Sequence, residues 1–259
     1  PSTYRVKWDI VGDPKVSILI PNKDHIDDLE KCLHSLWAKT SWDNFEVIVI
    51  ENNSTDPETF AYYQKAQRRY NGLQVVTYPK KGFNFSGINN FGRKYATGDY
   101  LLLLNNDVEV CNADWLTELL RQCAHPGGAA ICGAELFYPD ETLQHAGVIT
   151  GLGGYAGHSH KYAKRGGSGY MFRAATVQDL SAVTAACLLV KAAVYDEAGG
   201  LDEGFAVAFN DVDFCLRVRA LGTPSMHVSG GEPFLDVDKL CAVLQAAQEA
   251  ELPILENIL

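Results

Sequence analysis

Hydrophobic positions in the first 104 residues fall into four short runs, and each run stops at a group of polar residues. The runs cover residues 16–20, 45–50, 73–78 and 100–104, and the last reads Tyr-Leu-Leu-Leu-Leu. Apolar runs of strand length, with little alternation, are typical of a sheet that is covered on both faces. The pattern therefore predicts four buried strands.

The segments between these runs have the spacing of helices. Residues 25–39 place Ile26, Leu29, Leu33 and Leu36 on one face. Shorter patterns predict helices at 58–70 and 89–96. Because strands alternate with helices along the chain, we predict an α/β fold in which right-handed crossovers join parallel strands.

Beyond residue 107 the alternation becomes less regular. The spacing predicts helices over 114–123, 192–198 and 211–221, and apolar strands over 129–133 and 181–190. Residues 147–169 contain eight glycines among 23 residues, together with His158, His160 and several basic side chains. This composition suits either a mobile loop over a site or a simple surface excursion, and both interpretations stay open.

Length and charge limit the possible functions. The chain has 259 residues, of which 47% are hydrophobic, enough for one large α/β domain or two small ones. The net charge is −10, and no cluster of lysine and arginine stands out, which argues against a nucleic-acid binder. An acidic protein that binds a phosphorylated ligand is expected to use a metal ion or backbone amides.

Cysteine usage and the ends of the chain bear on its location. The seven cysteines are scattered without a Cys-x-x-Cys pair, which predicts reduced thiols in a cytoplasmic protein. No signal peptide or membrane-spanning run is visible. The chain begins with Pro1 instead of methionine, so we expect an excised domain whose parent protein can associate with the inner face of the membrane.

Polar residues follow each of the four predicted strands. The clusters are Pro21-Asn22-Lys23-Asp24, Glu51-Asn52-Asn53, Lys80-Lys81-Gly82 and Asn105-Asn106-Asp107. In a parallel sheet these ends converge on one edge, where α/β proteins bind ligands. Carboxylates and amides there can accept hydrogen bonds from a ribose and a base, Lys81 can face a phosphate, and Asp107 suits a hard cation. Each cluster taken alone is more typical of turns and helix caps than of a binding site, and only their convergence favours a site.

A second polar cluster begins the helix predicted at 211–221. Asp211 and Asp213 lie in its first turn, shortly after a glycine-rich bend at Gly199-Gly200. An acid aimed into a cleft from such a position could deprotonate a hydroxyl group. Stabilisation by the helix dipole is the alternative explanation.

Seven motifs, in order, resemble those of family 2 glycosyltransferases of the GT-A fold, especially bacterial rhamnosyltransferase-like enzymes. The motifs are Val-Ser-Ile-Leu-Ile-Pro-Asn-Lys-Asp (16–24), Val-Ile-Glu-Asn-Asn-Ser-Thr-Asp (49–56), Gly-Phe-Asn-Phe-Ser-Gly-Ile-Asn-Asn (82–90), Leu-Asn-Asn-Asp-Val-Glu (104–109), Leu-Gln-His-Ala-Gly-Val (143–148), Ser-Ala-Val-Thr-Ala-Ala-Cys-Leu-Leu-Val (181–190) and Phe-Asn-Asp-Val-Asp-Phe-Cys-Leu-Arg (209–217). The resemblance implies a Rossmann-like, mixed but mainly parallel sheet with helices on both faces. It also implies an inverting enzyme of cell-surface polysaccharide synthesis, O-antigen or capsule-like.

The resemblance assigns roles to individual residues. Asn105-Asn106-Asp107 matches the family's Asp-x-Asp element, with Asp107 as the ligand of Mn²⁺ or Mg²⁺ and with an amide at Asn105 where many relatives have an acid. Asp211 matches the catalytic base, and Asp213 is the second choice. The positions implied to surround the nucleoside are Pro21, Asp24, Glu51 and Asn53, and those near the diphosphate and donor sugar are Asn84, Ser86 and Asn89.

By the same resemblance, residues 1–222 form the transferase domain. Its donor half is expected at about 14–110 and its acceptor half at about 111–222. The expected partners are a nucleotide-diphosphate sugar and a saccharide or lipid-linked acceptor, with no nucleic acid. The alternative is a catalytically incomplete nucleotide-sugar-binding domain of a larger protein.

The last 37 residues depart from the family pattern. Relatives continue into a His-rich element, whereas this chain runs through His227 and Gly230-Gly231-Glu232-Pro233 into a predicted helix at 236–249. Gly-Gly-Glu-Pro resembles a strand end of radical S-adenosylmethionine enzymes, but the cysteine cluster of those enzymes is absent from the sequence. We expect a divergent tail, and whether His227 replaces the missing histidine stays open.

Overall fold

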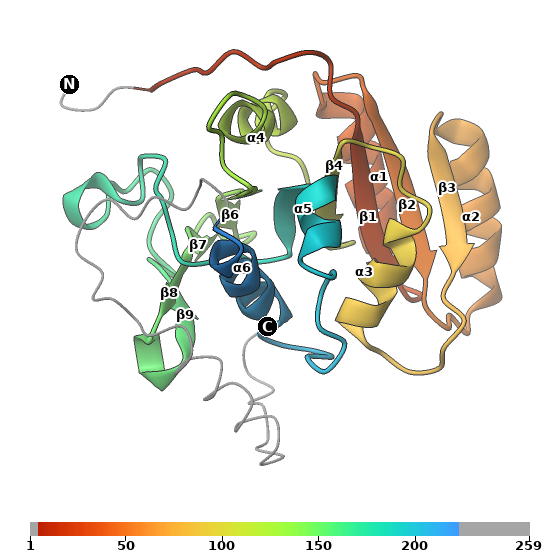
Figure 1. Cartoon of the computed structure of the whole chain (residues 1–259). Helices are drawn as coiled ribbons and strands as arrows, with labels where there is room; N and C mark the ends of the chain where they lie inside the picture. Colours follow the sequence, from red (N-terminus) through yellow and green to blue (C-terminus); the bar gives the residue numbers. More distant parts are fainter. Residues whose placement is uncertain (1–4, 223–259) are drawn as a thin grey trace.

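A central sheet of six strands organises the molecule, which is a computed structural model describing residues 5–222 (Figure 1). The strand order is β3-β2-β1-β4-β10-β5. In chain order the strands are β1 (Val16–Asn22), β2 (Phe45–Glu51), β3 (Leu73–Thr77), β4 (Tyr100–Leu104), β5 (Ile131–Gly133) and β10 (Cys187–Lys191).

One of the six strands, β10, runs in the opposite direction to the other five. The strands β1 to β4 are mutually parallel where they pair, whereas β10 runs antiparallel to both β4 and β5. The expectation of a mixed, mainly parallel sheet is confirmed. Because β10 is reversed, its start, and not its end, lies beside the carboxyl end of β4, where Cys187 pairs with Leu104.

Helices cover both faces of the sheet (Figure 1). One core joins the sheet to α1 (Ile26–Lys39), α2 (Pro57–Arg69) and α4 (Trp115–Cys123), and the other joins it to α3 (Phe85–Arg93), α5 (Ala192–Glu197) and α6 (Asn210–Ala220). Side chains alternate along β1, so Ile18 and Ile20 enter the first core and Leu19 enters the second. All three are fully buried. Burial of each stabilises the fold by about 1.5–3 kcal/mol.

Two predicted elements begin at other residues in the structure. Helix α3 begins at Phe85, four residues before the predicted start, because the Asn84 side chain caps it by accepting a hydrogen bond from the Gly87 amide (2.8 Å). The strand predicted at 181–190 forms only as β10. Residues 181–186 precede it, and the amides of Thr184 and Ala185 donate to the side chains of His145 and Asp211.

The region between β5 and β10 contains short antiparallel pairs. They are β6 (Leu136–Phe137) with β7 (Leu143–His145), and β8 (Val148–Thr150) with β9 (Ala156–His158). The same region contains two short 3₁₀ helices, η1 (Leu152–Gly154) and η2 (Tyr170–Phe172). Within the segment 147–169, whose composition suited a loop, residues 148–158 contain the β8–β9 hairpin, which the sequence did not predict. The hairpin turns at Gly151, whose φ of 87° is in the left-handed region and whose amide donates to the Tyr155 carbonyl (2.7 Å).

In Figure 1 the short strands lie on one side of α6, and the β3 edge of the central sheet lies on the other side. The predicted tail elements, with His227 and the Gly-Gly-Glu-Pro run, lie outside the described residues. Within residues 5–222, no helix has the length and hydrophobicity needed to cross a bilayer.

Candidate functional site

The polar ends of β1, β2 and β4 form one hydrogen-bonded network. Asn22 is 2% exposed, and its Oδ1 accepts from Asn106 Nδ2 (2.7 Å). Its Nδ2 donates to the Tyr63 hydroxyl (2.9 Å), which in turn donates to Glu51 Oε2 (2.8 Å). The predicted convergence of these strand ends is therefore present in the structure.

Glu51 holds the loop that follows β2. Its carboxylate, 2% exposed, accepts from both the amide and the hydroxyl of Ser54. Asp24 anchors the same loop from β1, because its Oδ1 accepts from the amides of Thr55 (2.9 Å) and Asp56 (3.0 Å). The Asp56 amide, followed by that of Thr55, lowers the pKa of Asp24. Both acids are thus kept in place by donors within the chain.

Backbone strain occurs at these two strand ends. Asp24, His25 and Asn53 have φ values of 52°, 45° and 59°, in the left-handed region that residues with a Cβ seldom adopt. The Asn53 side chain donates to Asn52 Oδ1 (2.8 Å) and to the carbonyl of Lys80 (2.9 Å). The bond to Lys80 links the polar cluster that follows β3 to the network.

The lysine pair after β3 is divided between two environments. Lys80 donates to Glu203 Oε2 (2.9 Å), and this bond lowers the pKa of Glu203. Lys81, the predicted phosphate contact, is exposed. Pro21 lies half-buried in β1 beside Asn22.

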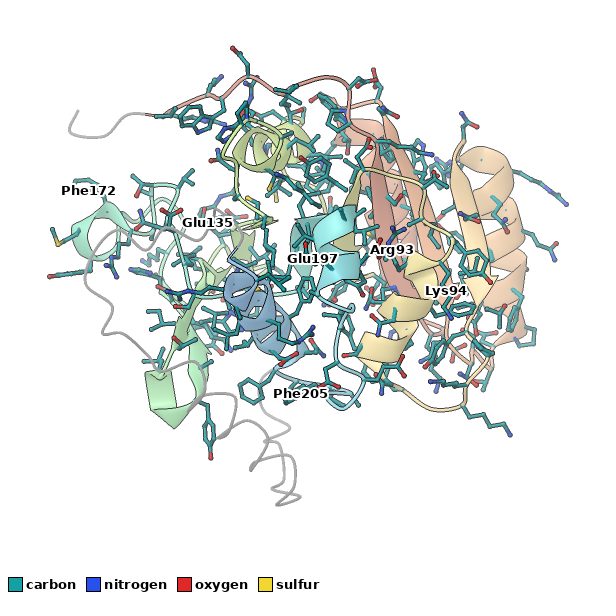
Figure 2. All side chains as sticks on the ribbon, viewed as in Figure 1. Arg93, Lys94, Glu135, Phe172, Glu197 and Phe205 are labelled. Atoms are coloured by element: carbon teal, nitrogen blue, oxygen red, sulfur yellow. The ribbon has the colours of Figure 1, made fainter. Side chains whose placement is uncertain are left out.

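The predicted diphosphate contacts belong to α3 and are bonded within the chain. Asn84 Nδ2 donates to the Glu203 carbonyl (2.8 Å), and the Ser86 hydroxyl donates to the carbonyl of Phe205 (2.8 Å). Figure 2 shows Phe205 on the loop that leads into α6. Ser86 and Asn89 are fully buried. Asn84 and Ser86 therefore join α3 to the loop before α6, whereas Asn89 donates to the Phe85 carbonyl within α3 (2.9 Å). Contact of these three residues with a donor stays a prediction.

Asp107 lies just beyond the end of β4 and is exposed. Burial, and then the charge of Asp107, raise the pKa of the neighbouring Cys32 to about 12. Within the described residues, no three His, Cys, Asp or Glu side chains gather as a metal site. One exposed carboxylate at a ligand-binding edge still fits Mg²⁺ or Mn²⁺, because such ions are commonly held by one or two carboxylates together with substrate phosphates.

Asp211 lies in the first turn of α6, directly after Phe209 and Asn210. Its Oδ2 accepts from the Ala185 amide (3.1 Å), and its Oδ1 accepts from the Val212 amide (2.8 Å). Phe209 has a φ of 61°, so the chain enters the helix through a strained bend. The carboxylate is half-buried and has lone pairs left for a substrate hydroxyl.

A short path of bonds connects Asp211 to the end of β4. The Ala185 amide holds Asp211, and the next residue, Ala186, accepts from the Asn105 amide (3.1 Å). Asn105 is two residues before Asp107. The predicted base and the predicted metal ligand therefore belong to the same edge of the sheet.

Asp213 has a different environment. It is 8% exposed, and its Oδ2 accepts from Arg217 Nε (2.8 Å), whose other nitrogens bond the carbonyls of Ala198 and Gly200. Burial raises the pKa of Asp213, although Arg217 opposes the shift. Of the two acids in this turn, Asp213 ties α6 to the bend at 198–200, and Asp211 faces the start of β10.

A pair of histidines next to Asp211 was not predicted from the sequence. His145, 1% exposed, and His158 approach through their Nδ1 atoms (2.8 Å), and the Thr184 amide donates to His145 Nε2 (3.3 Å). Burial lowers the pKa of both, that of His145 to about 3, while the charge of Asp211 opposes the shift of His158. His145 lies in the Leu-Gln-His-Ala-Gly-Val motif, which is the signal that could have singled it out.

This burial predicts acid sensitivity. In the unfolded chain His145 takes up a proton near pH 6.5, but in the folded protein only near pH 3, so between these values the unfolded state binds more protons. As pH falls through this window, His145 should lower the free energy of unfolding by up to about 1.4 kcal/mol per pH unit. Urea unfolding at several pH values measures this slope.

A His145→Gln variant, which cannot be protonated in this range, should show a shallower slope than the wild type. The matched change at exposed His34 of α1 should retain the wild-type slope. Equal slopes in the wild type and His145→Gln would contradict the assignment.

Comparison with known proteins identifies the family. Residues 17–176 match the model of glycosyl transferase family 2. An uncharacterized protein, y4gI of Sinorhizobium fredii, is 41% identical over 223 residues, which are 86% of this chain and 24% of the relative. The O-antigen biosynthesis protein RfbC of Myxococcus xanthus is 40% identical over 224 residues, 86% of this chain and 17% of the relative. The chain thus spans a quarter or less of these curated relatives.

A solved structure shares the fold. It is the mannosyltransferase PcManGT of Pyrobaculum calidifontis in complex with GDP-Man and Mn²⁺, with a TM-score of 0.62 at 14% identity over 88% of this chain and 59% of that one. The sheet and its two helix layers are those of the GT-A fold. Because the family model matches more than half of its length, the chain belongs to glycosyl transferase family 2.

Proposed function

We propose that this chain is the transferase domain of an inverting glycosyltransferase of cell-surface polysaccharide synthesis. It would move a sugar from a nucleotide-diphosphate donor to a saccharide or lipid-linked acceptor. The observation that carries the proposal is the path of hydrogen bonds from Asp211 through Ala185 and Ala186 to Asn105. It supports a base at Asp211 and a metal ligand at Asp107 that act at one edge of the sheet. The O-antigen biosynthesis relative supports the polysaccharide class.

The donor half is assigned to residues 14–110. The loops after β1 and β2 are braced by Asn22, Glu51 and Asp24, so the surface they present to a nucleoside is formed before binding. A preorganised loop loses less conformational entropy when the ligand binds. Lys81 is exposed, and in the proposal it contacts the diphosphate.

The acceptor half is assigned to residues 111–222. In the proposed reaction, Asp211 takes the proton of an acceptor hydroxyl as that oxygen attacks the anomeric carbon. The new carbon–oxygen bond forms as the bond to the diphosphate breaks, and the electron pair of that bond leaves with the phosphate oxygen. Attack from the opposite face inverts the configuration. A divalent cation held by Asp107 would supply positive charge to the leaving diphosphate.

Titration calorimetry with a panel of nucleotide sugars, with and without manganese, tests the donor half. We expect one or a few donors to bind, and to bind more tightly with the metal. Donor hydrolysis or transfer to a mixed saccharide acceptor pool, followed by mass spectrometry, then tests turnover.

Two outcomes contradict the proposal in different ways. Binding without any turnover would favour the alternative, an incomplete nucleotide-sugar-binding domain whose parent protein supplies the rest. Failure to bind any nucleotide sugar would refute both interpretations. A cytoplasmic location at the inner face of the membrane is part of the proposal and follows from where nucleotide sugars would be used.

A further inference from the structure

The segment between β9 and β10 carries the most exposed large apolar side chains in the part of the chain that the structure describes. Met171, Tyr170 and Val177 are 75%, 74% and 70% exposed. Phe172, next to Met171 in η2, is exposed as well. Large apolar side chains that gather on a surface mark a site of contact with another molecule. The proposed reaction uses none of these residues.

The tip of this segment, residues 168–176, is folded on itself. The Ala174 amide donates to the Ser168 carbonyl (3.1 Å), which closes the tip into a turn. A Cβ at Gly169 would lie 2.5 Å from His160 Nε2, so the missing side chain lets His160 pack against the tip. An ordered turn therefore displays the apolar side chains.

Two residues of the tip have strained backbones. Met171 and Phe172 have φ values of 49° and 62°, in the left-handed region, where a bulky residue is an outlier. Such strain clusters where a conformation serves a contact or a reaction. Figure 2 shows Phe172 at the opposite side of the molecule from α2. The strained turn thus holds its apolar side chains at an outer edge, where they meet solvent instead of the core.

The same part of the chain is basic, although the chain as a whole is acidic. Residues 142–178 contain no aspartate or glutamate, in a chain whose net charge is −10. Their lysine and arginine residues are Lys161, Lys164, Arg165 and Arg173. Lys164 and Arg165 are exposed, and Lys161 is half-buried. Exposed apolar side chains beside lysine and arginine are the combination that binds an anionic lipid surface.

Both ends of the segment lead to residues that hold the proposed base. The segment starts after His158, the last residue of β9, and the chain then reaches Ala185, whose amide bonds Asp211 Oδ2. The apolar tip therefore belongs to the acceptor half of the protein. An acceptor that is linked to a lipid would lie at the same membrane surface as the tip.

We propose that residues 160–177 form a membrane-contact surface, in which Tyr170, Met171 and Phe172 enter the headgroup region of an anionic bilayer while Lys164 faces lipid phosphates. This inference rests on the proposed function, because it selects a lipid-linked acceptor over a free saccharide. One short turn is small for a stable protein interface, whereas a lipid surface requires only that a few side chains insert.

Sedimentation of the full chain with lipid vesicles tests the charge. We expect tighter binding to vesicles that contain phosphatidylglycerol than to vesicles of phosphatidylcholine alone, and weaker binding as salt is added. Lys164→Gln should weaken binding to the anionic vesicles about fivefold, the contribution of one basic side chain near such a surface. Lys65→Gln, at an exposed position of α2, is the matched control and should bind like the wild type.

A double variant tests the apolar tip. Tyr170→Ser combined with Met171→Asn should weaken binding by about tenfold to a hundredfold, because two inserted side chains are lost. Asparagine tolerates the left-handed region and both side chains lie in solvent, so the fold should be retained. Phe60→Ser on α2, where the side chain is 44% exposed, is the matched control and should leave binding unchanged.

The outcomes separate this inference from the proposed function. Absence of wild-type binding to anionic vesicles, or equal binding by the wild type and the double variant, would overturn the inference. A dimer that the double variant abolishes, without vesicle binding, would also overturn it, because a second copy would then cover the tip. If sugar transfer to soluble saccharides occurs without vesicle binding, the inference alone fails. If vesicles bind through the tip but no nucleotide sugar binds, the proposed function fails.

Discussion

Replacing Asp211 by asparagine is expected to reduce sugar transfer by about a hundredfold to ten-thousandfold, the range attributed to a general base. The amide oxygen can keep one of the two bonds that the carboxylate accepts from the amides of Ala185 and Val212, so most of the fold should be retained. What is lost is the ability to take the acceptor proton. Rate assays with saturating donor, together with calorimetry for nucleotide affinity, measure the two effects separately.

Asp213 provides the control, since it lies in the same turn of α6. Asp213→Asn loses the ion pair with Arg217 and should lower stability by about 1–3 kcal/mol, with a smaller effect on the transfer rate of the folded fraction. Normal turnover by Asp211→Asn, or a larger rate loss in Asp213→Asn at matched folding, would refute the assignment of the base.

Replacing Asp107 by alanine is expected to remove metal-dependent transfer. A bound cation stabilises the transition state by several kcal/mol, so the loss should be at least about a hundredfold. Because Asn105 supplies an amide and not a second acid, little remains at this strand end to keep the ion. The tightening of nucleotide binding by manganese should disappear with the activity.

Glu109 offers a matched acid two residues further along. It is exposed and pairs with Lys39 on the surface, so Glu109→Ala should leave metal dependence unchanged. Full activity of the wild-type chain in the presence of a chelator would contradict the role of Asp107.

The sheet was predictable because its strands are buried on both faces and therefore read as unbroken apolar runs. The run at 100–104 is β4 without change, and the alternation of strands and helices predicted that the first four strands are parallel. The region after residue 107 was harder. Its hairpin at 148–158 is rich in glycine and lacks the alternation that marks a strand, so local composition could not distinguish it from a loop.

The convergence of the strand ends also followed from the sequence, because parallel strands end at one edge. The role of each residue at that edge could not be predicted from the sequence. Glu51 and Asn22 have the residue types of ligand contacts, yet they are buried and bonded to Ser54 and Tyr63. The histidine pair was missed because His145 and His158 are brought together only by the packing of two strand pairs.

The main chain of residues 184–186 forms hydrogen bonds that hold three parts of the site together. The amides of Thr184 and Ala185 and the carbonyl of Ala186 hold, in order, a histidine, the acid and the end of β4. Every residue type offers that carbonyl, and every type except proline offers those amides. A side-chain change that leaves the main chain in place should therefore preserve these bonds, whereas proline at position 184 or 185 would remove a donor.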